Sequence, residues 1–262
     1  MTTVLKLGGE LPEDAGAVQQ AAAAIVRLAG EGPLIVVHGG GRAIDAELRR
    51  RGLTPRFADG LRITDDEALD AVIAVLAGGT NTRLVAAVNA AGARGVGLTG
   101  ADARLGLCSR AAPVRTQGGE TVDLGLVGEP ARPDTSIVED LTRAGYVPVI
   151  ASIGATREGV LLNVNADTFA AHLAAALGAD RLIVAGTTPG VLDQAGRTIA
   201  RLTRADVDAL TKSGAAHSGM VAKLAACSHA AARGVRDVSI VAGRGIADFG
   251  EAPGTRLVPA AQ

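Results

Sequence analysis

Aromatic and sulfur-containing side chains are rare in this sequence, and its net charge is close to zero. Trp is absent, and one Tyr and three Phe are too few for a surface that stacks nucleic-acid bases. The formal net charge of −1 argues against affinity that depends on nucleic-acid phosphates or anionic membranes. The two cysteines have no motif spacing, so neither a disulfide scaffold nor a zinc site is predicted.

Membrane and export signals are also missing from the sequence. No apolar run approaches the ~18 residues of a membrane span, and the N-terminus has no signal-peptide pattern. Hydrophobic residues make up 48% of the chain and charged residues 20%, which is enough for a buried core and excludes a disordered protein. We therefore expect a soluble, cytoplasmic α/β protein.

Lysine is scarce as well. The chain has 26 basic residues, of which only Lys6, Lys212 and Lys223 are lysines. Where arginine is used almost everywhere, lysine is expected to persist at positions that a planar guanidinium does not fit. A compact ammonium suits contact with a phosphoryl group during transfer. We therefore interpret Lys6 and Lys223 as functional, and Lys212, near a predicted helix end, as a solvated residue.

Strand and helix patterns alternate along the chain. Short apolar strands are predicted at 2–7, 34–37, 95–98, 147–150, 181–184 and 238–241, with an edge strand at 255–258. Helices are predicted over 17–28, 42–51, 66–76, 81–91, 137–144, 167–177, 206–212 and 220–232, with a break at Gly78-Gly79, and exposed hairpins over 108–133. This alternation predicts a three-layer αβα sandwich around a mainly parallel sheet, in a single domain over 1–262.

Two glycine clusters, Gly8-Gly9 and Gly39–Gly41, follow the first two predicted strands. Ligands bind at the carboxyl ends of parallel strands, and glycine lets backbone N–H groups approach an anion. We therefore predict a phosphate site there. No lysine stands in the Gly-Lys-Ser/Thr pattern of a P-loop, which excludes that class. The dinucleotide-like segment Gly95–Gly100 is disfavoured because no helical pattern follows it.

Polar residues at two predicted element ends are further candidates. Arg62 stands at a helix entrance, where a guanidinium can clamp a substrate carboxylate. Asn163, Asn165 and Asp167 share one face of an extended segment that leads into a helix. Asp167 either caps that helix or holds two lysines in their charged state. The segments 185–193 and 218–223 are either walls of a nucleotide pocket or ordinary turns.

Seven segments together span nearly the whole chain: Lys6–Gly9, Val37–Gly41, Gly60–Thr64, Ser152–Gly159, Asn163–Asp167, Pro189–Leu192 and Gly219–Lys223. These segments, in this order, resemble the amino-acid kinase superfamily and, within it, the N-acetylglutamate kinase family. Lys6–Gly9 alone would indicate only the superfamily, whereas Gly60–Thr64 and Asn163–Asp167 point to kinases of acetylated amino acids.

The resemblance implies a role for each matching residue. Lys6 and Lys223 would neutralise charge on the transferring phosphoryl group, and Asp167 would organise them. Substrate binding is implied for Gly40, Gly41, Arg62 and Asn163. Phosphate or nucleotide binding is implied for Gly8, Gly9, Thr187, Gly190, Val191, Leu192 and Gly219. The implied cofactors are ATP and Mg²⁺, with no metal held by protein side chains.

The implied activity is ATP-dependent, in-line phosphorylation of the γ-carboxylate of N-acetyl-L-glutamate in arginine biosynthesis. One alternative is the kinase of N-acetyl-L-2-aminoadipate in lysine biosynthesis, whose substrate is one methylene longer. The other is a non-catalytic sensing module, supported only by Gly186, at a position that we assign to an Asp of family members.

The resemblance also implies how the chain is divided and assembled. A lobe over about 1–160 would bind the acyl substrate and dimerise, and a lobe over about 161–262 would bind the nucleotide. Arginine-inhibited members carry an extra N-terminal helix, and this chain begins almost at its first strand. We therefore expect an arginine-insensitive homodimer without a nucleic-acid or membrane partner.

Overall fold

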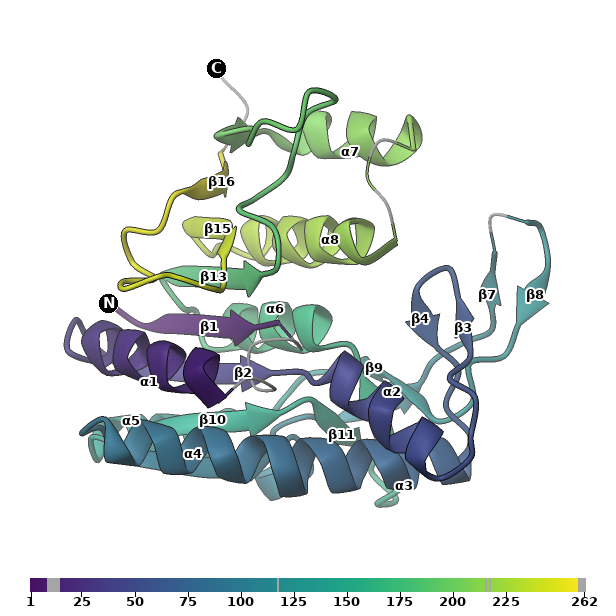
Figure 1. Cartoon of the computed structure of the whole chain (residues 1–262), viewed down its shortest axis with the longest axis horizontal. Coiled ribbons are helices and arrows are strands. Elements are labelled where there is room, and N and C mark those ends of the chain that lie inside the picture. The colour runs from purple at the N-terminus through teal and green to yellow at the C-terminus, as the bar shows by residue number, and fades with distance from the viewer. Residues whose placement is uncertain (9–14, 117, 215, 217, 259–262) are drawn as a thin grey trace.

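An eight-stranded sheet crosses the computed structural model, which describes residues 1–8, 15–116, 118–214, 216 and 218–258 (Figure 1). Its strand order is β14-β16-β15-β13-β1-β2-β10-β5. All neighbours pair in parallel except β15 and β16. The strands are β1 (Thr3–Leu7), β2 (Leu34–His38), β5 (Gly95–Thr99), β10 (Val147–Ala151), β13 (Arg181–Gly186), β14 (Arg201–Leu202), β15 (Asp237–Ala242) and β16 (Gly254–Leu257).

Helices cover both faces of this sheet. They are α1 (Ala15–Ala29), α2 (Gly41–Arg50), α3 (Asp66–Ile73), α4 (Asn81–Ala90), α5 (Ser136–Arg143), α6 (Ala166–Ala176), α7 (Arg204–Lys212) and α8 (Ser218–Ala232). Alternate strand residues pack on opposite faces: Val4 lies in a core with α5, α6 and α8, and Leu5 lies in a core with α1 and α4. The predicted αβα sandwich with a mainly parallel sheet is therefore confirmed.

Small sheets extend from the layers on the side of α2. The four-stranded one has the order β11-β12-β9-β6, and two hairpins, β3-β4 and β7-β8, stand beside it (Figure 1). The predicted hairpins over 108–133 fall within this region. The strands are β3 (Phe57–Ala58), β4 (Leu61–Arg62), β6 (Cys108–Arg110), β7 (Val114–Arg115), β8 (Thr121–Val122), β9 (Val127–Pro130), β11 (Ile153–Ala155) and β12 (Leu161–Val164).

Two details of the sequence prediction are wrong. Residues 255–258 were expected at the sheet edge, but β16 lies between β15 and β14. The two-residue strand β14 is too short to show a pattern in the sequence. The break expected at Gly78-Gly79 is also absent, because Ala74–Thr80 form a π-helical turn that joins α3 to α4. A π turn keeps the backbone helical through the glycines at the cost of one extra residue per turn.

The resulting helix, Asp66–Ala90, is long and apolar enough to cross a membrane by length and composition alone. Its buried residues nevertheless belong to the protein core. Leu84 and Val88 pack in the core cluster with α1, and Val72 and Leu76 pack with α2 and β11. Such burial is what a core helix of a folded domain requires, so the helix is explained without a bilayer.

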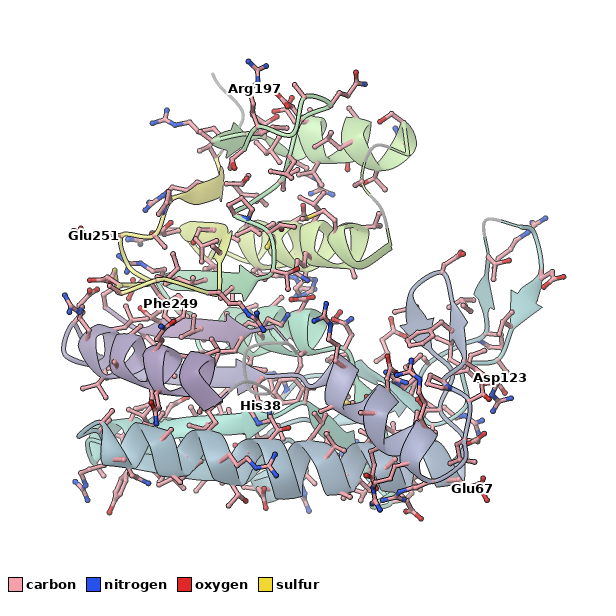
Figure 2. The ribbon with its side chains drawn as sticks, in the orientation of Figure 1. His38, Glu67, Asp123, Arg197, Phe249 and Glu251 are labelled. Carbon is pink, nitrogen blue, oxygen red and sulfur yellow. The ribbon has the colours of Figure 1, made fainter. Side chains whose placement is uncertain are left out.

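The π turn also directs Asn81 into the protein, against the end of β2. Asn81 Nδ2 donates to the carbonyl oxygen of Val149 at 2.8 Å and lies 3.0 Å from Nε2 of His38. Nδ1 of His38 lies 3.1 Å from the carbonyl oxygen of Gly39. A neutral imidazole protonated on Nδ1 satisfies both contacts. His38, labelled in Figure 2, therefore ties the long helix to the glycine segment that follows β2.

The first prediction concerns His38 and acid stability. Burial lowers the pKa of His38 from 6.5 to about 4. Between pH 6.5 and about 4, the imidazole of His38 binds a proton in the unfolded chain but not in the folded protein. The stabilisation from a neutral His38 is therefore fully present above pH 6.5 and is lost as the pH falls to about 4. The loss attributable to His38 is at most about 3 kcal/mol.

Urea unfolding between pH 7.5 and 4.5 measures this effect. The stability of His38→Gln should fall less steeply with decreasing pH than that of the parent, whatever its stability at pH 7.5. Equal slopes for the two proteins would contradict the prediction.

Candidate active site

Three charged side chains meet at the carboxyl ends of the central strands. Lys6 lies near the end of β1, Asp167 is in the first turn of α6, and Lys223 is in the first half of α8. Lys6 Nζ is 2.6 Å from Asp167 Oδ1, and Lys223 Nζ is 3.4 Å from Oδ2. Lys6 is 4% exposed and Asp167 5%, whereas the Lys223 side chain is 19% exposed. The sequence prediction that Asp167 reaches both lysines is confirmed by this geometry.

In this group, which we call the triad, each lysine stabilises the ionised form of Asp167, and Asp167 stabilises the charged form of Lys6. Burial tends to raise the pKa of Asp167, but the two ammonium groups outweigh burial, so the pKa of this carboxyl lies below its ordinary value. Burial lowers the pKa of Lys6, Asp167 opposes that shift, and Lys223 adds to it. An ionised Asp167 thus keeps two like charges close together. Two ammonium groups and one carboxylate leave one positive charge for an anionic ligand.

Asn165, and not Asp167, caps helix α6. The side-chain oxygen of Asn165 accepts hydrogen bonds from the N–H groups of Asp167 at 2.9 Å and Thr168 at 3.1 Å. The alternative that Asp167 is simply a cap is therefore wrong. Because Asn165 satisfies the helix end, the carboxylate of Asp167 is left to bind the lysines, and the positive end of the helix dipole favours its ionised form.

A cavity of about 220 Å³ lies beside the triad, between the end of β2 and the β3-β4 hairpin. The four residues predicted to bind substrate all contribute to its lining, together with Lys6 and Asp167: Gly40, Gly41, Arg62 and Asn163. Asn163 is held by a hydrogen bond from its Nδ2 to Thr64 Oγ1, at 3.0 Å. Thr64 is fully buried, so the amide of Asn163 has a rigid support.

The glycine segment after β2 is packed tightly on two sides. A Cβ atom at Gly40 would lie 2.7 Å from Leu76 in the π turn, and one at Gly39 would lie 3.3 Å from Cβ of Ala166. Gly40 and Gly41 form the start of α2, where the first N–H groups of a helix have no partner within the helix. The backbone can therefore present donors to an anion in the cavity.

Arg62 is fixed within this cavity with part of its guanidinium unused. Its Nη2 is 2.6 Å from Asp45 Oδ1, and its guanidinium carbon lies 4.7 Å from the centre of the Phe57 ring. The side chain is 8% exposed, and Nη1 is buried without a hydrogen-bond partner among the residues that the structure describes. Such a nitrogen suits a ligand carboxylate. Sequence reasoning missed Asp45, which has no distinctive motif.

Of the residues predicted to bind the nucleotide, those that the structure describes do not line this cavity. Thr187, Leu192 and Gly219 are exposed, and Gly9 lies outside the described residues. Gly8 packs against β13, where its N–H donates to the carbonyl oxygen of Ala185 at 2.9 Å. These positions are compatible with a second ligand approaching from the side of β13 and α8.

Gly190 and Val191 are held in place by contacts with Thr255. Gly190 has φ +144°, and a Cβ there would lie 2.7 Å from Thr255 Oγ1. Val191 is buried in the core, and its N–H donates to the same Oγ1 at 2.8 Å. The described contacts of these two residues therefore hold the loop against β16.

Gly186 makes room for Lys223. A Cβ at Gly186 would lie 3.2 Å from Cε of Lys223, which is tighter than ordinary side-chain contact. A side chain at this strand end would therefore require Lys223 to shift by a few tenths of an ångström. The one residue that favoured a non-catalytic module thus lies against Lys223, and the triad is formed with glycine at this position.

A metal ion finds few protein ligands here. Among the described residues, no group of three or more His, Cys, Asp or Glu side chains could hold a metal. Asp167, the carboxylate that lines the cavity, has each oxygen paired with a lysine. A dedicated Mg²⁺ cage therefore does not fit the described residues of this site.

The chain is similar to known proteins in both sequence and fold. Residues 1–242 match the amino acid kinase family. Acetylglutamate kinase of Novosphingobium aromaticivorans is 39% identical over 253 residues, covering 93% of this chain and 84% of the relative. The enzyme of that name from Parvibaculum lavamentivorans is 40% identical over 250 residues, covering 93% and 82%. In fold, the chain resembles the crystal structure of smu.665 from Streptococcus mutans UA159, with a TM-score of 0.79, 24% identity and 98% of both chains covered.

The second prediction tests the triad as a structural unit. Asp167→Asn should leave two buried ammonium groups without a counter-charge, and removing one partner from a buried ion pair typically costs about 3–5 kcal/mol. Chemical unfolding at pH 7 measures the loss. Asp140→Asn is the matched control, because Asp140 and Arg143 form a pair of which both side chains are at least 70% exposed. The control should change stability by less than about 1 kcal/mol; similar losses in both variants would contradict the prediction.

Proposed function

The chain belongs to the amino acid kinase family, and on that basis we propose that it transfers the γ-phosphoryl group of ATP to the γ-carboxylate of N-acetyl-L-glutamate. The proposed product is an acyl phosphate of arginine biosynthesis. The observation that carries the proposal is the triad beside a cavity that contains the unpaired Arg62 nitrogen. The positively charged triad, which suits a phosphoryl group, thus adjoins the Arg62 guanidinium, which suits a carboxylate.

The proposed chemistry is in-line transfer without a covalent enzyme intermediate. A γ-carboxylate oxygen of the acetylated amino acid forms a bond to the γ-phosphorus as the bond to the ADP oxygen breaks. Lys6 and Lys223 offset the negative charge on the phosphoryl oxygens, and Asp167 fixes the two ammonium groups in place. Their action is positioning and charge stabilisation, which act in water-poor sites without reorganisation.

The cavity residues orient the acyl substrate in this proposal. Arg62 binds its α-carboxylate through Nη1, while Asp45 and Phe57 keep the guanidinium in position. Asn163, held by Thr64, binds the acetamido end. Gly40 and Gly41 donate backbone hydrogen bonds to the phosphoryl group and to the acyl phosphate formed. Mg²⁺, when bound with ATP, would supply further charge neutralisation on the phosphates.

We assign the nucleotide to the opposite side of the triad. Gly8, Gly9 and Gly219 would approach its phosphates, and the 187–192 loop would border the adenosine. The division into an acyl-binding lobe over about 1–160 and a nucleotide-binding lobe over about 161–262 stays a prediction. The position of Lys6 supports this division. Lys6 lines the cavity on one side, and its strand β1 lies next to β13 on the other.

A homodimer of the arginine-insensitive type also stays a prediction. Sedimentation equilibrium would report the oligomeric state, and titration of the rate with L-arginine would report inhibition.

The third prediction concerns the substrate. ADP release should depend on an acetylated acidic amino acid, and kcat/KM should be higher for N-acetyl-L-glutamate than for N-acetyl-L-2-aminoadipate. One methylene is worth about 1–3 kcal/mol of discrimination, so the preference should lie between roughly 10-fold and 200-fold. A preference for the longer acid would indicate the lysine-pathway kinase. Absence of ADP release with either acid would favour the non-catalytic module.

The fourth prediction uses the scarcity of lysine. Lys6→Arg and Lys223→Arg keep the charge but put a wider head group into a buried site, beside Asp167 and Gly186 respectively. Loss of one charge-stabilising donor typically costs 10²–10³ in turnover, and we expect roughly that decrease in kcat for each variant. The control is Lys212→Arg at the exposed end of α7, which should be unchanged. Turnover of both site variants within about threefold of the parent would refute the hypothesis.

A further inference from the structure

A second cavity, of about 610 Å³, lies between α6, α8 and the segment that follows β9. It shares no lining residue with the cavity beside the triad. Four nitrogen-rich side chains from three segments line it: Arg132, His172, His229 and Arg233. The rest of its described lining is Thr135 and small or proline residues. No step of the proposed phosphoryl transfer uses any of these groups.

Two imidazole rings stack where α6 meets α8. The rings of His172 and His229 have centroids 4.0 Å apart and planes 12° apart. Burial, together with smaller contributions from His229 and Arg233, lowers the pKa of His172 from 6.5 to about 4. Burial and Arg233 also lower the pKa of His229. Both rings are therefore neutral at pH 7, and each keeps one N–H donor for a ligand.

The positive charge at this cavity is not balanced by the protein. No carboxylate lines it, and neither Arg132 nor Arg233 forms an ion pair within the part of the chain that the structure describes. The acidic residues nearest to the two arginines in sequence are Asp134, Glu129 and Asp237, and none of them lines the cavity. Asp134 accepts from the hydroxyl of Ser136 at 2.7 Å, Asp237 pairs with Arg181 and Arg256, and Glu129 is exposed on β9.

Simpler explanations account for only part of this arrangement. Arg233 directly follows α8, where the helix dipole favours a positive charge. That effect explains one arginine, but not the convergence of two arginines and two imidazoles on one hollow. A transition metal would find two histidines there, but it would also face two guanidinium groups and no carboxylate. The charge and donor pattern favours an anion.

We propose that this cavity binds a small multivalent anion, one that carries two or more carboxylate or phosphoryl groups. Arg132 and Arg233 pair with its charged groups, and the N–H groups of His172 and His229 donate to it. The anion replaces the counter-charge that the protein lacks, so the pKa of the histidine pair rises when it binds. Binding is therefore coupled to proton uptake and is tighter at lower pH.

Two probes are added to the protein: citrate, which carries carboxylate groups, and inorganic pyrophosphate, which carries phosphoryl groups. Titration calorimetry at pH 6.0 and 8.0, in buffers of different ionisation enthalpy, measures affinity and proton uptake. Both probes also change their own protonation between these pH values, so proton uptake by the protein is read from its imidazole signals: we expect the apparent pKa of His172 or His229 to rise when at least one probe is bound. Because pyrophosphate can also bind at the triad, location is read from the imidazole C2–H NMR signals of His172 and His229, assigned with His172→Asn and His229→Asn.

The variant Arg132→Gln/Arg233→Gln should weaken binding at this site at least tenfold and abolish the shifts of the two imidazole signals. The control, Arg143→Gln/Arg197→Gln, removes the same charge from exposed surface pairs and should bind like the parent. A response to citrate alone would identify a carboxylate ligand, and a response to pyrophosphate alone a phosphoryl ligand. Unshifted His172 and His229 signals with both probes, or equal affinity in the two double variants, would overturn the proposal. Basal kinase activity is not part of this test, so it stands apart from the proposed function.

Discussion

The contact of one carboxylate with two ammonium groups is the constraint around which this protein is arranged. Asp167 receives Lys6 on one oxygen and Lys223 on the other, in a place that water hardly reaches. Without the carboxylate, burial and mutual repulsion would both oppose the two positive charges. With it, three separate segments of the chain, β1, α6 and α8, are held at one point, and one positive charge remains for a ligand.

The surroundings of the triad serve that arrangement. Asn165 caps α6 and so leaves Asp167 available, and Gly186 leaves room for Lys223. On the other side, the π turn brings Leu76 against Gly40 and directs Asn81 to His38. These contacts are local and steric, yet together they fix the distance between the charged group and the glycine segment that lines the cavity. A rigid site of this kind lowers the cost of orienting two substrates.

Helices α6 and α8 connect two differently charged places. Their amino-terminal halves carry Asp167 and Lys223, and their later turns carry the stacked pair of His172 and His229. In the triad the protein itself supplies the counter-charge. In the second cavity, the exposed side chains of Arg132 and Arg233 have no ion-pair partner among the described residues, and the anion that we propose would supply the counter-charge.

The sequence by itself determined the alternation of strands and helices, the parallel sheet and the identity of the triad, because periodicity, glycine placement and the scarcity of lysine are local or compositional signals. Tertiary structure decided which groups meet. Whether Asp167 caps a helix or binds lysines depended on Asn165. The apparent break at Gly78-Gly79 became a π turn because Thr80 and Asn81 could be buried. The ion pair of Asp45 with Arg62 and the ring stacking of His172 on His229 each join residues from separate elements of the chain. Such pairings arise from packing between distant segments, which no single stretch of sequence encodes.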